Sequence, residues 1–244
     1  MRFGVMLAVA IGVLSCGESA QTCVVAIDIG HSESVPGATS ARGVSEYSFN
    51  HNIAELLRQK LQMIGMEGAF IVEAQGNGRS LGDRTKAAAS RNADFFISIH
   101  HDSVQPSYLN TWTYQGVERP YSDRFSGFSL FVSMQGPKSA ENLALAQSIG
   151  TRLLNAGFHP SLHHAEKIKG ESRELLDQKL GIYAFNDLIV LKTATMPAVL
   201  LECGVIVNRD EELRLRDRAY RDRLVAAVVA GISQRCGHKT SKPH

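Results

Sequence analysis

Residues 95–101 read FFISIHH, a mostly apolar run that ends on two histidines. A short run of aromatic and β-branched residues is typical of a strand that is buried on both faces of a parallel sheet. Runs of this kind predict further strands at residues 24–27 (VVAI), 70–72 (FIV), 129–133 (SLFVS), 188–191 (LIVL) and 198–203 (AVLLEC).

Helical periodicity separates these runs. Apolar residues that recur every three or four positions predict helices at residues 45–65, 84–93, 140–154 and 211–232. Strands that alternate with helices favour a single α/β domain, with a mostly parallel, twisted sheet flanked by helices on both faces. Residues 102–125 show no clear period and predict a long loop, and residues 160–179 are polar and ambiguous.

Length and charge limit the class of function. The chain has 244 residues, with 26 basic and 24 acidic side chains and a formal net charge of +2. This length is sufficient for one full core, and neither an internal repeat nor a dividing linker is evident in the sequence. So balanced a charge argues against a nucleic-acid partner and fits a small or an uncharged-to-acidic substrate.

The first twenty residues have the pattern of a secretory signal. Arg2 precedes an apolar run from Val5 to Leu14, which is too short for a membrane span of about 20 residues. We therefore predict a signal peptide at residues 1–20, a catalytic domain at 21–237 and a polar tail at 238–244, with export to the periplasm or cell envelope. A lipid anchor at Cys16 is the less favoured alternative, because Leu14 is an imperfect residue for that signal.

Three cysteines remain after such a cleavage. An exported protein can form a disulfide, and an odd number of cysteines leaves one thiol over. Cys23 and Cys236 bracket the folded part of the chain, and the two ends of a domain often lie close together. We predict a Cys23–Cys236 disulfide and a free Cys203, which lies in an apolar run and should be buried.

Polar side chains follow several of the predicted strands. His31 comes after the first strand, His100 ends the third and Glu202 lies in the last, while Glu46 begins the first helix. The carboxyl ends of parallel strands share one edge of the sheet, so these side chains should meet there. Two imidazoles and one carboxylate form a recurring catalytic zinc set, and a further carboxylate such as Glu202 can transfer protons.

Each residue alone also has a structural explanation. His31 could be a turn residue, and Glu46 could be a carboxylate favoured by the helix dipole. His100 could simply be a hydrogen-bonded histidine at the end of a strand, and this interpretation is as well supported as that of a metal ligand. Glu202 is hardest to explain in this way, because a carboxylate within an apolar strand is costly to bury. Their combination, rather than any one of them, indicates a metal site.

Four motifs in order resemble one family. They are DIGH at residues 28–31, Glu46 at a helix start, SIH at 98–100, and PAVLLECG at 197–204 followed by Asn208. This pattern resembles the zinc-dependent N-acetylmuramoyl-L-alanine amidases of the cell-wall amidase type (amidase type 3), over residues 24–232. The family usually has a small residue and Asn after its metal-binding histidine, where this chain has His101 and Asp102.

The resemblance implies a fold, a cofactor and roles for these residues. One zinc ion per chain would be bound by His31, Glu46 and His100, at the carboxyl ends of the strands, and Glu202 would be the general base and acid. Strand alternation and the motif favour His100 over His101 as the ligand. The substrate would be the amide between N-acetylmuramic acid and L-alanine in peptidoglycan, and the resemblance allows a protein activator as a further partner.

Two alternatives and one regulatory hypothesis remain. A zinc peptidase acting within the stem peptide would use the same chemistry, and an inactive wall-binding module would keep only the fold. In some relatives a helix covers the zinc, and residues 160–179, which contain His163 and His164, could do so here. Glu166 or Glu171 would then fill the open zinc position. A solvated charged face is the simpler interpretation of this segment.

Overall fold

The computed structural model describes residues 23–72 and 81–240, with only the backbone of residues 238–240. The predicted signal peptide and Cys16 lie outside these residues. The last helix continues to Thr240, inside the predicted polar tail. Within the described ranges, the helices are either too short or too polar to cross a membrane.

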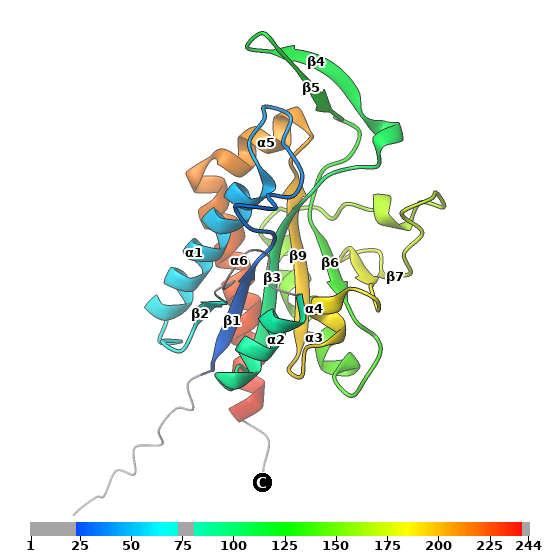
Figure 1. Ribbon diagram of the computed structural model, residues 1–244. Coiled ribbons are helices and arrows are strands. Elements are labelled where there is room, and N and C mark those ends of the chain that lie inside the picture. The colour runs from blue at the N-terminus through cyan, green and yellow to red at the C-terminus, as the bar shows by residue number, and fades with distance from the viewer. Residues whose placement is uncertain (1–22, 73–80, 241–244) are drawn as a thin grey trace, which may run out of the picture.

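A seven-stranded sheet forms the centre of the molecule (Figure 1). Its strand order is β2-β1-β3-β9-β6-β8-β7. Neighbours from β2 to β9 are parallel, whereas β6 is antiparallel to β9 and β7 is antiparallel to β8. The predicted mostly parallel sheet is confirmed. The strands are β1 (Val25–Ile29), β2 (Phe70–Val72), β3 (Phe95–Asp102), β6 (Ser129–Val132), β7 (Leu175–Asp177), β8 (Ile182–Ala184) and β9 (Ala198–Val205).

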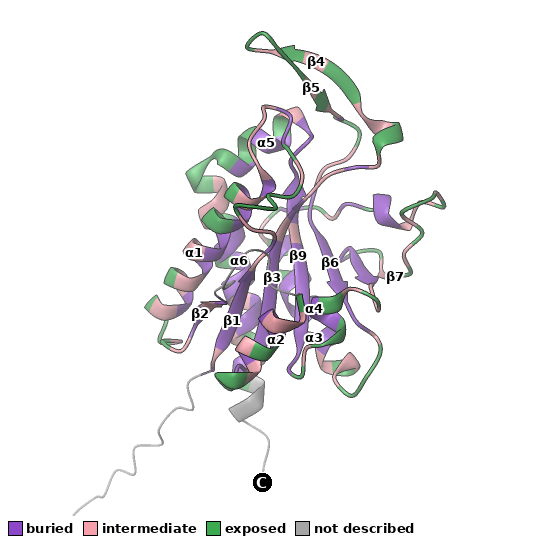
Figure 2. Ribbon diagram, viewed as in Figure 1, coloured by how far each residue is buried: buried purple, intermediate pink, exposed green. Residues whose placement is uncertain are grey.

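Helices cover both faces of the sheet, as expected. Along β3, Ile97 and Ile99 pack into one apolar core and Phe96 packs into the other, because successive side chains point to opposite faces. The central strands, such as β1, β3, β6 and β9, are therefore buried on both sides (Figure 2). The first core includes α1 (Glu46–Met63), α3 (Ser139–Asn155), α5 (Arg209–Arg216) and α6 (Arg218–Thr240). The second includes α2 (Leu81–Ser90) and α4 (Ile189–Lys192).

Two sequence predictions of secondary structure are wrong. Residues 188–191 are not a strand, because they form most of helix α4, in which Val190 and Leu191 are buried while Ile189 is exposed. So short an apolar run fits either structure, and periodicity cannot decide between them. The predicted C-terminal helix is two helices, because Asp217 has extended backbone between α5 and α6.

The predicted loop at residues 102–125 contains a β-hairpin. Its strands are β4 (Asn110–Tyr114) and β5 (Val117–Tyr121), which project beyond the sheet (Figure 1). Gln115 and Gly116 join them with φ angles of 51° and 78°. Positive φ at both turn positions matches the right-handed twist of a hairpin, although Gln is an unusual residue for the first of them. A short 3-10 turn, η1 (Pro106–Tyr108), precedes the hairpin.

A disulfide joins the two ends of the domain. Cys23, just before β1, is bonded to Cys236 in α6, with a Cα–Cα distance of 5.8 Å. This confirms the predicted pairing. Cys203 is buried and bonds to neither of the other described cysteines.

Removing this disulfide should destabilise the domain. Its two cysteines are 213 residues apart in the chain, so the crosslink strongly limits the entropy of the unfolded chain. The double variant Cys23→Ser/Cys236→Ser should lose about 2–5 kcal/mol of unfolding free energy, measured by chemical denaturation. The reduced wild type should behave like the variant. Equal stability of the oxidised and reduced wild type would contradict the prediction.

Candidate metal centre

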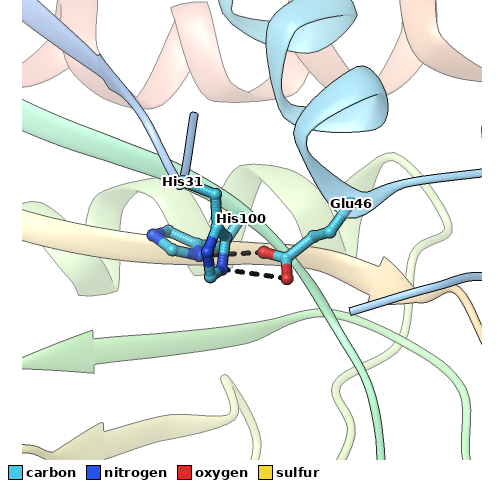
Figure 3. Close-up of side chains that lie close together, drawn as sticks. All are labelled: His31, Glu46 and His100. Atoms are coloured by element: carbon cyan, nitrogen blue, oxygen red, sulfur yellow. Dashed lines mark hydrogen bonds and ion pairs between the residues drawn. The ribbon is translucent and has the colours of Figure 1, made fainter. Parts of the chain in front are cut away.

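Three side chains from separate elements meet at the carboxyl ends of β1 and β3 (Figure 3). Glu46 lies between the two histidines. Its Oε2 is 3.0 Å from His31 Nε2, and its Oε1 is 3.0 Å from His100 Nδ1. One ligand atom from each residue lies within 4.8 Å of the others, so the group could hold a metal ion. The structure thus brings together the three residues that the sequence analysis selected as ligands.

The start of helix α1 positions Glu46. Ser45 caps this helix, accepting a hydrogen bond from the backbone N–H of Ser48, so Glu46 is the first helical residue. Asn50, one turn later, donates to Glu46 Oε1 at 3.2 Å and to the Gly30 carbonyl at 3.1 Å. Burial would raise the pKa of Glu46, but hydrogen bonds to His100 and His31 more than offset it, so the pKa is lowered.

His31 lies in a strained loop directly after β1. Its φ angle is 67°, in the left-handed region that few non-glycine residues adopt. Two glycines leave room for the imidazoles. A Cβ at Gly30 would collide with the His100 ring, and a Cβ at Gly37 would lie 2.6 Å from the His31 ring. The close packing of backbone around the rings therefore requires glycine at both positions.

A buried ion pair beneath the rim fixes the backbone of this loop. Arg84 donates to Asp28 Oδ1 at 2.8 Å and also to the carbonyls of Ile29 and His31, at 2.6 Å and 2.9 Å. Ser98 donates to the other oxygen of Asp28 at 2.6 Å. The sequence alone assigned Arg84 no role, because its partners, the Asp28 side chain and two backbone carbonyls, lie more than fifty residues away in the chain.

The structure distinguishes His100 from His101. His100 points toward Glu46, whereas His101 is buried and contacts Asn50 Oδ1 through Nδ1 at 2.8 Å. Burial lowers the pKa of His101 to about 3, so this side chain is neutral at physiological pH. His101 therefore packs beside the site and is not part of the three-residue group.

Glu202 lies beside His100 on the neighbouring strand, since the two residues are direct partners in the β3–β9 register. Its Oε2 is buried and has no hydrogen-bond partner among the described residues. Burial, together with the negative charges of Asp102 and Glu46, raises the pKa of Glu202 well above its usual range. A buried carboxyl without a partner is costly, which is typical of a functional group.

Two clefts lie next to the candidate centre. One, of about 370 Å³, is lined by His31, His100, the ion pair of Asp28 and Arg84, and several apolar side chains. The other, of about 250 Å³, is lined by His100, Glu202 and residues that include part of the segment 160–179. His100, Leu188 and Leu200 line both, so the two clefts are neighbours.

The polar segment 160–179 does not cover the centre with a helix. It contains a 3-10 turn, η2 (His163–Ala165), and strand β7. Glu166 accepts a hydrogen bond from Tyr108, and Glu171 contacts His164 and Gln105. Neither carboxylate belongs to the group of His31, Glu46 and His100 in this structure, and the hypothesis that one of them fills the open metal position stays a prediction. Glu171 instead lines the smaller cleft.

Fold and site define an α/β protein with a candidate metal centre at the rim of its sheet. The model of the N-acetylmuramoyl-L-alanine amidase family matches residues 25–234, most of the chain. The chain therefore belongs to this family, as its motifs predicted.

Known proteins agree with this assignment. Amidase AmiC of Neisseria meningitidis is 23% identical over 225 residues, which cover 89% of this chain and 54% of the relative. Amidase LytC of Bacillus subtilis is 29% identical, with 84% of this chain and 34% of the relative covered. The chain thus spans about half or less of the length of these relatives.

Solved structures share the fold. Amidase Ami1 of Mycobacterium smegmatis has a TM-score of 0.67 at 20% identity, and the match covers 88% of this chain and 97% of that one. The CwlD amidase of Clostridioides difficile, solved in complex with the GerS lipoprotein, has a TM-score of 0.59 at 18% identity, covering 88% and 99%.

Arg84→Lys should weaken metal binding. Lysine keeps the charge but cannot donate to Asp28 and to both carbonyls at once, so the His31 loop should loosen. Altering a residue that orients a metal ligand typically costs 10- to 100-fold in affinity, and we expect a loss of about this size for zinc. Chelator competition measures it. Arg91→Lys, where the arginine stacks on Phe70, is the matched control. Unchanged affinity in folded Arg84→Lys would contradict the role.

Proposed function

We propose that this chain is a zinc-dependent N-acetylmuramoyl-L-alanine amidase. It would hydrolyse the amide between the lactyl group of N-acetylmuramic acid and the L-alanine of the stem peptide. Family membership supports the reaction. The observation that carries the mechanism is the unpartnered, buried Oε2 of Glu202 beside the group of His31, Glu46 and His100.

The donor set fits zinc. Two imidazoles and one carboxylate are a recurring catalytic set that leaves a position free for water or substrate. The side chains of His31 and His100 are 30% and 19% exposed, so the group is reachable from the clefts. When bound there, zinc would lower the pKa of water and polarise a carbonyl. We propose His31 Nε2, His100 Nδ1 and the Glu46 carboxylate as the ligands.

Glu202 is the proposed proton carrier. As a carboxylate it would accept the proton of the attacking water at Oε2, and as the acid it would donate this proton to the leaving nitrogen. A general base works best when its pKa approaches the working pH, and burial raises the pKa of Glu202 in that direction. The residue therefore suits both steps.

The two neighbouring clefts are the proposed substrate site, together forming one groove across the rim. The larger cleft has apolar walls that include Leu81 and Val190, and the smaller contains the charged side chains of Glu171 and Arg173. Because His100 of the candidate centre lines both clefts, a substrate could extend to both sides of the scissile amide. We propose that one cleft holds the glycan and the other holds the stem peptide, and we do not assign which cleft holds which.

Export and an activator complete the proposal. The sequence of residues 1–20 supports export to the periplasm or cell envelope, where peptidoglycan is found. A lipid anchor at Cys16 is retained as the less favoured alternative. The solved complex of CwlD with the GerS lipoprotein supports a protein partner for this chain as well.

Product analysis of digested sacculi tests the reaction. The zinc-loaded protein should release intact stem peptides that begin with L-alanine and leave the glycan strands uncut, as read by mass spectrometry. A chelator should abolish this release, and zinc should restore it. Fragments cut within the stem peptide would indicate the peptidase instead, and binding without turnover would indicate a wall-binding module.

Glu202→Gln should retain the fold and the zinc but lose most activity. Glutamine preserves the shape of the side chain and removes proton transfer, which is typically worth about 100- to 10,000-fold in rate. Release of stem peptide from sacculi measures the loss, and metal analysis checks zinc content. Glu67→Gln, at an exposed glutamate, is the control. Near-normal turnover in Glu202→Gln would exclude the role, and loss of zinc would make Glu202 a ligand.

A further inference from the structure

A second group of potential ligands lies beside the candidate centre. Asp102 is two residues beyond His100 on β3, and His163 and His164 form the turn η2. Asp102 Oδ2 is 2.7 Å from His164 Nε2 and 3.2 Å from His163 Nε2. One atom from each residue lies within 4.8 Å of the others. This group shares no residue with the first.

Both imidazoles are oriented as metal ligands usually are. Each points Nε2 toward Asp102, while Nδ1 is occupied by another partner. His163 Nδ1 is 2.8 Å from Ser161 Oγ, and His164 Nδ1 is 2.9 Å from Glu171 Oε2. Ligand histidines almost always use the second ring nitrogen in this way, which fixes the tautomer and the ring orientation. Both Nε2 lone pairs would then be free for an ion.

His163 makes only a poor contact with Asp102. Its side chain is 1% exposed, and its Nε2, 3.2 Å from Asp102 Oδ2, lacks the geometry of a hydrogen bond to any residue that the structure describes. The ring stacks on Phe125, with ring centres 4.9 Å apart, and this contact helps to hold its orientation. Burying a polar atom without a hydrogen bond is costly. An ion between the three side chains would remove this cost.

A metal-free ion pair explains only half of the arrangement. Asp102 Oδ2 and His164 Nε2 are 2.7 Å apart, so a hydrogen-bonded pair of these two side chains would satisfy Asp102. It would leave His163 Nε2 without a hydrogen bond, although that atom lies 3.2 Å from the same carboxylate oxygen.

We propose that Asp102, His163 and His164 bind a second divalent transition-metal ion of the zinc type, separate from the ion at His31. Two imidazoles and one carboxylate suit zinc and neighbouring metals better than calcium or magnesium, which prefer oxygen. Asp102 belongs to the central sheet and the histidines belong to the polar segment. The ion therefore attaches that segment to the sheet.

The position of this ion gives it a structural role in the groove. His164 and Glu171 line the same cleft as His100 and Glu202. The second ion would hold this wall of the cleft in place. This second site is independent of the proposed amidase function, because the metal can bind there whether or not the chain cuts peptidoglycan.

Metal counting with matched variants tests the proposal. The protein is stripped with a chelator, dialysed against buffered zinc and analysed by mass spectrometry for zinc per chain. Wild type should hold two zinc ions per chain, and each of the single variants His163→Phe and His31→Ala should hold one. The double variant His31→Ala/His163→Phe should hold none. Phenylalanine removes the ligand atom and keeps an aromatic ring against Phe125. His159→Phe, at an exposed histidine nearby, should keep two.

Thermal melting gives a second readout that needs no activity. Zinc at about 100 times its Kd should raise the Tm of His31→Ala by roughly 5–10 °C, because only the folded protein binds it. The same zinc should not raise the Tm of the double variant. Asp102→Asn replaces His163→Phe in both measurements if the latter does not fold.

One result overturns the second site. If wild type holds a single zinc that His31→Ala removes and His163→Phe retains, the cluster is a metal-free ion pair. Failure of the amidase proposal gives a different result, in which the protein binds two ions but releases no stem peptides. The two proposals can therefore fail independently.

Discussion

The buried carboxylate of Glu46 is the constraint on which the rest of the rim depends. A lone carboxylate in this position would be costly to bury, and its cost is offset by contacts on every side. Its two oxygens face His31 and His100, and they also accept hydrogen bonds from Asn50 and the backbone of Ala38. The N-terminus of α1 adds a favourable dipole. One negative charge thereby joins β1, β3 and α1.

The sheet supplies the remaining geometry. The parallel register of β3 and β9 pairs His100 directly with Glu202, so a proposed ligand and the proposed proton carrier lie on adjacent strands. Apolar cores on both faces hold these strands in place. Below the rim, Arg84 ties the strained loop of His31 to Asp28. A rigid scaffold of this kind keeps two histidines ready for an ion before it binds.

Sequence reasoning succeeded where a local pattern dictates the structure. The apolar runs at residues 95–99 and 198–203 are strands, and rules for parallel sheets correctly placed His31, Glu46, His100 and Glu202 at one edge. It failed where the pattern was short or atypical, as in helix α4 and in the hairpin turn.

Other features depend on contacts between distant parts of the chain. The ion pair of Arg84 and the cluster of Asp102 with His163 and His164 join segments more than fifty residues apart, which no spacing rule connects.

Zinc-edge anomalous diffraction from zinc-loaded crystals tests most directly the claim that His31, Glu46 and His100 bind zinc. The account predicts an ion about 2.0–2.2 Å from His31 Nε2, His100 Nδ1 and a Glu46 oxygen. No ion at these three atoms, or one bound by His101 in place of His100, would contradict it.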